Sequence, residues 1–375
     1  TQIPWSAWIE PLLAWGLFLG ALYLVMVAIC VLLRRQWMEH ERLLYPLMQP
    51  SLALIDRAPD ALLPRLCQSS LLWVGIAIPM FIGLINGLHA YYEFIPKLIL
   101  EQNFALFRQT TTVRAALSFT TLGFAYFLSS DISLGIWVFN MLAKCQEGAF
   151  NVLGIASEET MEWVTVPYLA HQSLGAMIVL VVWGLWTARR HLRVTIEIAL
   201  RRGQFAETED GSSHTDRDEI MSYRSAWLSL LVGGPFLWWW LWRTGMPAWT
   251  AALVLIVGMV LFVGLTRMVT EGGFFITRAP INPGNAIISG VGVDALGTAG
   301  VTGLGYSFVW VGEMRIFVMA ACANALKIAQ TIQGNRRLLL WVMLGAILIS
   351  VWSSVYTELR LCYRYGGINL STFHT

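Results

Sequence analysis

The chain has 375 residues, of which 57% are hydrophobic and only 13% charged, and its formal net charge is +2. So few charges cannot cover the surface of a soluble globule of this size, and a chain this hydrophobic is not disordered. A net charge near zero argues against a nucleic-acid partner held by bulk electrostatics. We therefore expect a polytopic membrane protein whose first partner is the lipid bilayer.

Long apolar runs locate the predicted membrane crossings, because a spanning helix needs about 17–25 predominantly apolar residues. Six runs meet this requirement: 11–33, 71–89, 170–188, 225–242, 247–266 and 338–357. Two regions do not fit one simple helix each. Residues 113–146 hold two shorter apolar runs, and residues 268–326 are interrupted by Gly and Pro, which predicts two broken crossings or a re-entrant element.

Groups of arginine orient these crossings, since cytoplasmic loops carry an excess of Lys and Arg. Such groups follow the first run at Arg34-Arg35, lie between 189 and 202, and precede the last run at Arg336-Arg337. Placing all three in the cytoplasm requires about ten crossings. We predict an all-α transmembrane helix bundle with a first bundle at 1–188 and a second at 225–375. Because the chain begins without Met, close to an apolar run, we also expect a fragment of a longer protein.

Asp131 lies between the two apolar runs of the 113–146 region, after Ser129-Ser130. It is either the polar tip of a tight hairpin or a buried carboxylate at a helix break. As a capping residue for a helix beginning near Ile132 it would have an ordinary structural role. We keep Asp131 as a candidate pathway residue.

Residues 189–224 form the longest polar stretch and are predicted to join the two bundles in the cytoplasm. Leu192, Ile196, Ala199 and Leu200 recur at helical spacing, which favours an amphipathic interfacial helix. The rest of the stretch is predicted to be a polar loop, with a phosphate or metal site as the weaker reading.

The Gly- and Pro-rich region 268–305 carries the strongest functional signal. It contains Glu271-Gly272-Gly273 and then Arg278, Asn282 and Asn285. An ionisable residue at membrane depth is costly unless it is paired or functional, and broken helices mark solute and ion sites in transporters. Two alternatives stay open. The glycines can simply allow close helix packing, and Glu271 can lie solvated at the cytoplasmic interface.

Glu313 and Lys327 flank a shorter apolar run further along the chain. They can pair for structural reasons or take part in a proton relay. The sequence lacks a zincin motif, a G-x-S-x-G motif and a P-loop, and its five cysteines form no CxxC pair. We therefore predict no catalytic residues, no metal site and no cofactor, and we do not expect an enzyme.

Three segments carry a resemblance to a known family. Glu41-Arg42-Leu43-Leu44-Tyr45-Pro46-Leu47-Met48-Gln49 is similar to the entry into a helix in the oligopeptide transporter family. Glu271-Gly272-Gly273 and the ending Tyr363 to Asn369 resemble bacterial polytopic proteins of unknown function that are distantly similar to those transporters. The resemblance implies a larger inverted-repeat fold that moves small peptides or metal chelates with protons. The sequence departs from that family after Pro46, where Leu47-Met48-Gln49 replaces a Ser-Gly-Thr run.

The function expected from these observations is secondary active transport in the bacterial inner membrane, with proton- or cation-coupled uptake of small peptides or related solutes. Glu271 is the leading coupling carboxylate, Asp131 the second, and Arg278 a partner for Glu271 or for an anionic substrate. The alternatives are a non-transporting scaffold subunit and a lipid-modifying enzyme.

Overall fold

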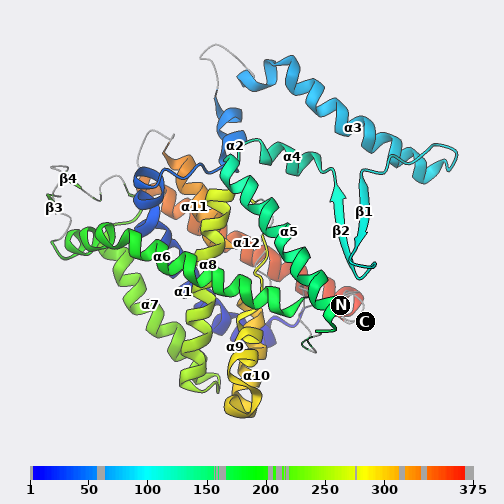
Figure 1. Ribbon diagram of the computed structural model, residues 1–375. Helices are drawn as coiled ribbons and strands as arrows, with labels where there is room; N and C mark the ends of the chain where they lie inside the picture. The colour runs from blue at the N-terminus through cyan, green and yellow to red at the C-terminus, as the bar shows by residue number, and fades with distance from the viewer. Residues whose placement is uncertain are drawn as a thin grey trace. The chain divides into compact units, whose positions relative to one another are not determined.

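The computed structural model describes residues 3–56, 64–155, 157, 159, 166–201, 206–207, 213–214, 216, 219–274, 277–311, 317–330 and 336–367. Figure 1 labels the elements in chain order. The first part of the chain contains α1 (Trp5–Arg35), the π-helix η1 (Gln36–His40), α2 (Met48–Ile55), the 3-10 helix η2 (Arg65–Gln68) and α3 (Ser70–Tyr91). The strands β1 (Glu101–Leu106) and β2 (Thr111–Ala116), then α4 (Phe119–Ala125), α5 (Ser130–Leu153) and α6 (Pro167–Leu200), follow. The remaining elements are β3 (Ala206–Glu207), β4 (Ser213–His214), α7 (Tyr223–Arg243), α8 (Ala248–Gly272), α9 (Pro283–Val291), α10 (Val293–Val311), α11 (Val318–Ala329) and α12 (Arg336–Tyr365).

The expected helical bundle is confirmed: apart from two short β-hairpins, the described elements are helices. Five of the helical segments in the described residues are long and apolar enough to cross a membrane. They are Trp5–His40, Ser70–Tyr91, Pro167–Leu200, Ala248–Gly272 and Arg336–Tyr365. The sixth long run, 225–242, forms α7, which is not among the five because serine and tryptophan dilute its apolar character.

The chain divides into two compact units, and the first contains residues 1–42, 179–263 and 282–375. Its core is built around α1, whose fully buried side chains Phe18, Leu22 and Met26 recur at helical spacing. Helix α7 packs along α1 at Gly233, where a Cβ atom would lie 2.6 Å from Cγ2 of Val25. Glycine at this position therefore lets the two helices approach closely.

The second unit contains residues 43–178 and 264–281. Strands β1 and β2 pair antiparallel from Glu101–Ala116 to Leu106–Thr111. The tip of this hairpin rests on α5: the amide of Asn151 donates to the carbonyl of Thr110 and to the hydroxyl of Thr111, both at 3.2 Å.

Residues 113–146 do not form two spanning helices as expected. Strand β2 occupies the beginning, and α4 has seven residues, about 10 Å of helix, which is far shorter than the bilayer core. Threonine-rich 110–112 favours a strand, and α4 ends at Ala125, before Ser129 caps the start of α5. The expected total of about ten crossings exceeds the five helices of spanning length, and the other crossings stay a prediction.

The polar stretch after residue 188 also differs from expectation. Residues 189–200 continue α6 without a break, and the side chains that they bury are Thr195 and Ile198 rather than Ile196 and Leu200. Each compact unit combines segments from both predicted bundles. The predicted boundaries at 188 and 225 therefore do not coincide with the packing units, and they stay a prediction about how the membrane crossings are grouped.

Candidate functional site

The region between α8 and α10 is interrupted three times by glycine in backbone conformations that other residues rarely adopt. Gly273 follows α8 with φ of 58°, Gly292 separates α9 from α10 with φ of 87°, and Gly297 interrupts α10 with φ of 63° and ψ of 176°. The predicted discontinuity of this region is therefore present, and the nine-residue α9 is a short helix between breaks.

Asn282 and Asn285, two of the predicted site residues, lie together at the N-terminus of α9. Asn282 is the N-cap: its Oδ1 accepts a hydrogen bond from the backbone N–H of Gly284 at 2.9 Å. The side chain is 8% exposed, and its Nδ2 has no hydrogen-bond partner among the described residues. Asn285 is half-buried in the first turn.

Some glycines of this region serve close packing within the first unit. A Cβ atom at Gly284 would lie 3.5 Å from the carbonyl oxygen of Leu304, so α9 packs closely on α10. Gly300 of α10 faces Thr250 of α8, and Gly303 faces Met246. By contrast, Gly290, Gly292, Gly297 and Gly305 have open space around them. Close helix packing therefore accounts for Gly284, Gly300 and Gly303, but it does not account for the four glycines with open space around them.

Several buried polar side chains in the first unit lack a partner among the described residues. Besides Nδ2 of Asn282, they include Oγ1 of Thr250, Nε1 of Trp310 and Oδ1 of Asn324. Burying a polar group without a hydrogen bond costs free energy, and the cost is highest where no water is available. These groups therefore mark places where water or a bound solute would be stabilising.

Glu271 is paired, but with a residue that the sequence reasoning missed. Nε of Arg267 donates to Oε2 of Glu271 at 2.8 Å, one turn earlier on α8. The side chain of Glu271 is 41% exposed, and Arg278, its predicted partner, is exposed as well. The i, i+4 spacing of Arg267 and Glu271 was the signal that could have predicted this pair.

Gly272 and Gly273 join the end of α8 to the segment before α2. The backbone N–H of Tyr45 donates to the carbonyl of Thr270 at 3.0 Å, and Tyr45 is fully buried. A Cβ atom at Gly273 would lie 2.5 Å from Cβ of Pro46. Two of the three segments that carry the family resemblance thus contact each other within the second unit, at Tyr45-Pro46 and at Thr270 and Gly273.

The other predicted residues are dispersed. Asp131 is exposed in the first turn of α5, and the N-cap of that helix is Ser129, whose hydroxyl accepts from the N–H of Ile132. Lys327 lies on α11 and donates to Oε1 of Gln330 at 3.2 Å. Glu313 lies outside the described residues. Asp131, Glu271 and Arg278 belong to the second unit, and Asn282, Asn285 and Lys327 to the first.

A buried ionic cluster at the end of α1 was not predicted. The carboxylate of Glu219 is fully buried, and both Arg34 and Arg35 donate to it, at 2.6 to 2.8 Å. The hydroxyl of Tyr223 donates to the same carboxylate at 3.2 Å. Tyr223 precedes the apolar run 225–242; burial, and then the Glu219 charge, raise the pKa of its phenol, which keeps the hydroxyl protonated as a donor.

This cluster ties the end of the 189–224 segment to the end of α1. A second polar contact reinforces it: the ring Nε2 of His191 on α6 donates to the carbonyl of Leu32 at 2.9 Å. The remaining space beside Arg34 and Glu219 is about 10 Å³, which holds a water molecule at most. We interpret the cluster as a structural link.

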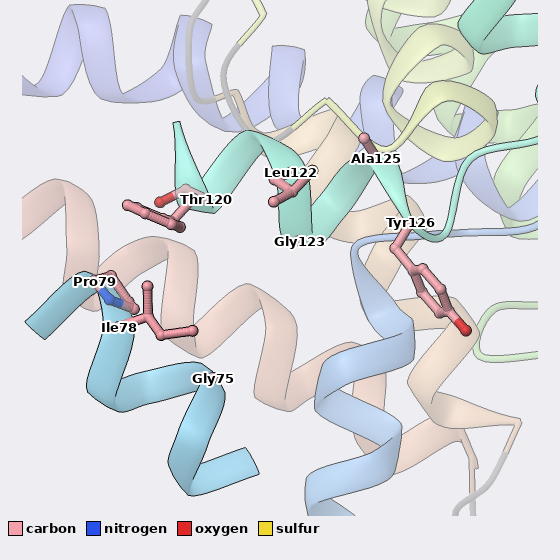
Figure 2. A pocket seen from close by; sticks show the side chains of 9 residues that line it. Gly75, Ile78, Pro79, Thr120, Leu122, Gly123, Ala125 and Tyr126 are labelled. Carbon is pink, nitrogen blue, oxygen red and sulfur yellow. The ribbon is translucent and has the colours of Figure 1, made fainter. Parts of the chain in front are cut away.

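The second unit contains an open groove between α3 and α4. It has a volume of about 860 Å³, and its lining includes Ile78, Pro79, Phe119, Leu122 and Tyr126. Figure 2 shows the side chains of the two helices on either side of it. None of its lining residues is charged, and none is a predicted site residue. The described residues also contain no group of three or more His, Cys, Asp or Glu that could hold a metal ion.

Comparison with known proteins gives a family but no activity. No curated protein and no solved structure matches the chain. One family model matches residues 1–374, which is nearly the whole sequence. The chain therefore belongs to a family of unknown function, DUF6785.

Proposed function

We propose that this chain is a secondary active transporter of the bacterial inner membrane that moves small peptides or related solutes together with a proton or another cation. The observation that carries the proposal is the interrupted region α8–α9–α10, where a short helix begins with a buried amide that has no partner among the described residues.

The physical argument starts from the lipid environment. A helix that only anchors a protein in a membrane has no need of breaks, because each break frees backbone groups that the bilayer cannot satisfy. Such breaks are tolerated where they line a wet cavity or a solute site, and ends of half-helices present partial charges to the solute. The open space around Gly290, Gly292 and Gly297 supports this reading over close packing alone.

The residue roles follow from chemistry and from the resemblance to the oligopeptide transporter family. Asn282 and Asn285 are proposed to contact the solute. Glu271 is the proposed coupling carboxylate: it is half-exposed, so a proton can reach it, and its Oε2 lies 2.8 Å from Nε of Arg267. Gly272 and Gly273 position it at the end of α8, and Asp131, Arg278, Glu313 and Lys327 remain secondary candidates.

The test is proton movement driven by a peptide. The purified chain is reconstituted into liposomes that contain a pH-sensitive dye, and tri-alanine is added outside. We expect tri-alanine to acidify the interior above the rate in protein-free liposomes, and Glu271→Gln to reduce this rate at least tenfold. Glu197→Gln, which changes an exposed residue of α6, is the matched control. Absence of peptide-dependent acidification across di-, tri- and tetra-alanine would overturn proton-coupled peptide transport and favour a scaffold.

A further inference from the structure

The N-terminus of α9 presents hydrogen-bond donors and no charge. The amide orientation of Asn282 is fixed by its role as N-cap: the backbone N–H of Gly284 needs an acceptor, so Oδ1 faces it and Nδ2 is the free group. Nδ2 can only donate. Because Asn282 is only 8% exposed, this donor is withheld from bulk solvent.

A second donor lies in the same turn. Pro283 has no N–H, Gly284 bonds to the cap, and the N–H of Ala286 bonds to the carbonyl of Asn282 at 2.9 Å. Among the described residues, the N–H of Asn285 is therefore the first-turn amide to which neither the helix backbone nor the cap side chain supplies an acceptor. The aligned peptide dipoles add a partial positive charge at this end.

Helix α10 holds this turn in place. A Cβ atom at Gly284 would lie 3.5 Å from the carbonyl oxygen of Leu304 and 3.6 Å from the ring of Phe308, so this turn is in van der Waals contact with α10. The hydroxyl of Ser307 donates to the same Leu304 carbonyl at 2.6 Å, so that carbonyl is already satisfied. The unmet groups at this site are thus donors, which an oxygen acceptor with negative charge satisfies best.

We propose that the N-terminus of α9 binds the carboxylate of the transported solute, with Nδ2 of Asn282 and the backbone N–H of Asn285 as the two donors. This inference rests on the proposed transport function and specifies its solute: a molecule with a free carboxylate, such as the C-terminus of a short peptide. An inorganic anion such as phosphate would use the same donors, and the test separates the two.

Ligand-induced stabilisation of the purified full chain tests the binding without requiring transport. Thermal unfolding in detergent is followed with tri-alanine, tri-alanine amide and inorganic phosphate at equal concentrations. Since a ligand that binds only the folded state raises the melting temperature, we expect tri-alanine to raise it and tri-alanine amide to raise it far less. Equal shifts with the peptide and its amide would overturn the inference, and a shift with phosphate alone would assign the site to inorganic anions.

The substitution Asn282→Asp sharpens the test. Aspartate keeps the capping oxygen, so α9 retains its cap, but it replaces the free donor by an acceptor that repels a carboxylate. We expect at least a tenfold loss of apparent affinity for tri-alanine. Ser129→Asp places a new carboxylate at the N-cap of α5 and is the matched control, with unchanged affinity expected. If Asn282→Asp does not fold, the comparison of peptide and amide on the unsubstituted chain still decides the question.

The outcomes also separate this inference from the transport proposal. Stabilisation that depends on the carboxylate and on Asn282, without any peptide-driven proton entry, would support the binding site and overturn transport. Proton entry that is equal for peptide and amide, and unaffected by Asn282→Asp, would support transport and overturn the site.

Discussion

Two arginine-paired carboxylates show how burial determines the contribution of a single residue. Glu219 is fully buried against Arg34 and Arg35, whereas Glu271 is 41% exposed beside Arg267. A buried pair is costly to break because the remaining charge stays desolvated, but an exposed pair is screened by water. The two pairs therefore differ in their expected contribution to stability despite similar distances: the Glu219 cluster is costly to break, and the Arg267–Glu271 pair is not.

We predict that Glu219→Gln lowers the free energy of unfolding by about 3–5 kcal/mol, because two buried guanidinium groups lose the buried carboxylate that they share. Tyr223→Phe removes one hydrogen bond to the same carboxylate and should cost about 0.5–1.5 kcal/mol. Glu271→Gln is the control, with an expected loss of at most about 0.5 kcal/mol. Unfolding in detergent, followed by circular dichroism, measures all three. Equal losses for Glu219→Gln and Glu271→Gln would contradict the prediction.

The sequence could identify some of these residues but not their partners. Glu271 is conspicuous because a carboxylate follows a long apolar run, and its partner lies four residues away on the same helix. Glu219 lies in a polar stretch that resembles a connecting loop, and its partners are 184 and 185 residues away. Only tertiary structure brings those groups together, so no local pattern could predict the cluster.

Among the helices and strands, the predicted bounds were most accurate where the local sequence contains a strong signal for the start or end of an element. The breaks around α9 were predictable because Gly and Pro end helices locally. The end of α6 was not: residues 189–200 contain neither Gly nor Pro, so the helix continues to Leu200 although its composition turns polar. The hairpin β1–β2 was missed because its pairing depends on contacts with α5 rather than on clear alternation.

The kink in α10 leads to a prediction about the whole helix. Gly297 adopts φ of 63° and ψ of 176°, a conformation that is accessible essentially to glycine alone. Gly297→Ala should therefore destabilise the protein by about 1–3 kcal/mol, or straighten α10 and displace the start of α9. Gly305→Ala, in a helical part of α10 with open space around it, should be neutral or slightly stabilising. The comparison of the two melting temperatures checks the prediction, and equal effects would contradict it.

For the whole molecule, hydrophobic length proved to be the most reliable guide. Each of the six long apolar runs corresponds to one long helix, with only Pro247 falling outside its helix, because length and composition are local properties. The grouping of helices into units was not predictable: the chain leaves the first unit after residue 42 and returns to it at 179 and again at 282. Such grouping depends on which faces fit together, as at Gly233 and Val25, and the sequence does not encode it by periodicity alone.

The length of α6 gives a prediction for the orientation of the chain in the membrane. Its 34 residues extend about 50 Å, well beyond the hydrocarbon core of about 30 Å. Since Arg189, Arg190 and Arg193 occupy its last third, the positive-inside rule places that part in the cytoplasm. Tyr92, which follows α3, should then lie on the outer side, because α3 runs outward from the cytoplasmic end of α1.

Single-cysteine variants test this orientation in cells. The five native cysteines are replaced by serine, and Arg193→Cys or Tyr92→Cys is added. A membrane-impermeant maleimide applied to intact cells should label the cysteine at 92 and not the one at 193, whereas inside-out vesicles should reverse the pattern. Labelling of both from the same side would mean that the chain crosses the membrane an even number of times between positions 92 and 193, where the prediction requires an odd number. The orientation, and with it the cytoplasmic position of the arginine groups, would then be wrong.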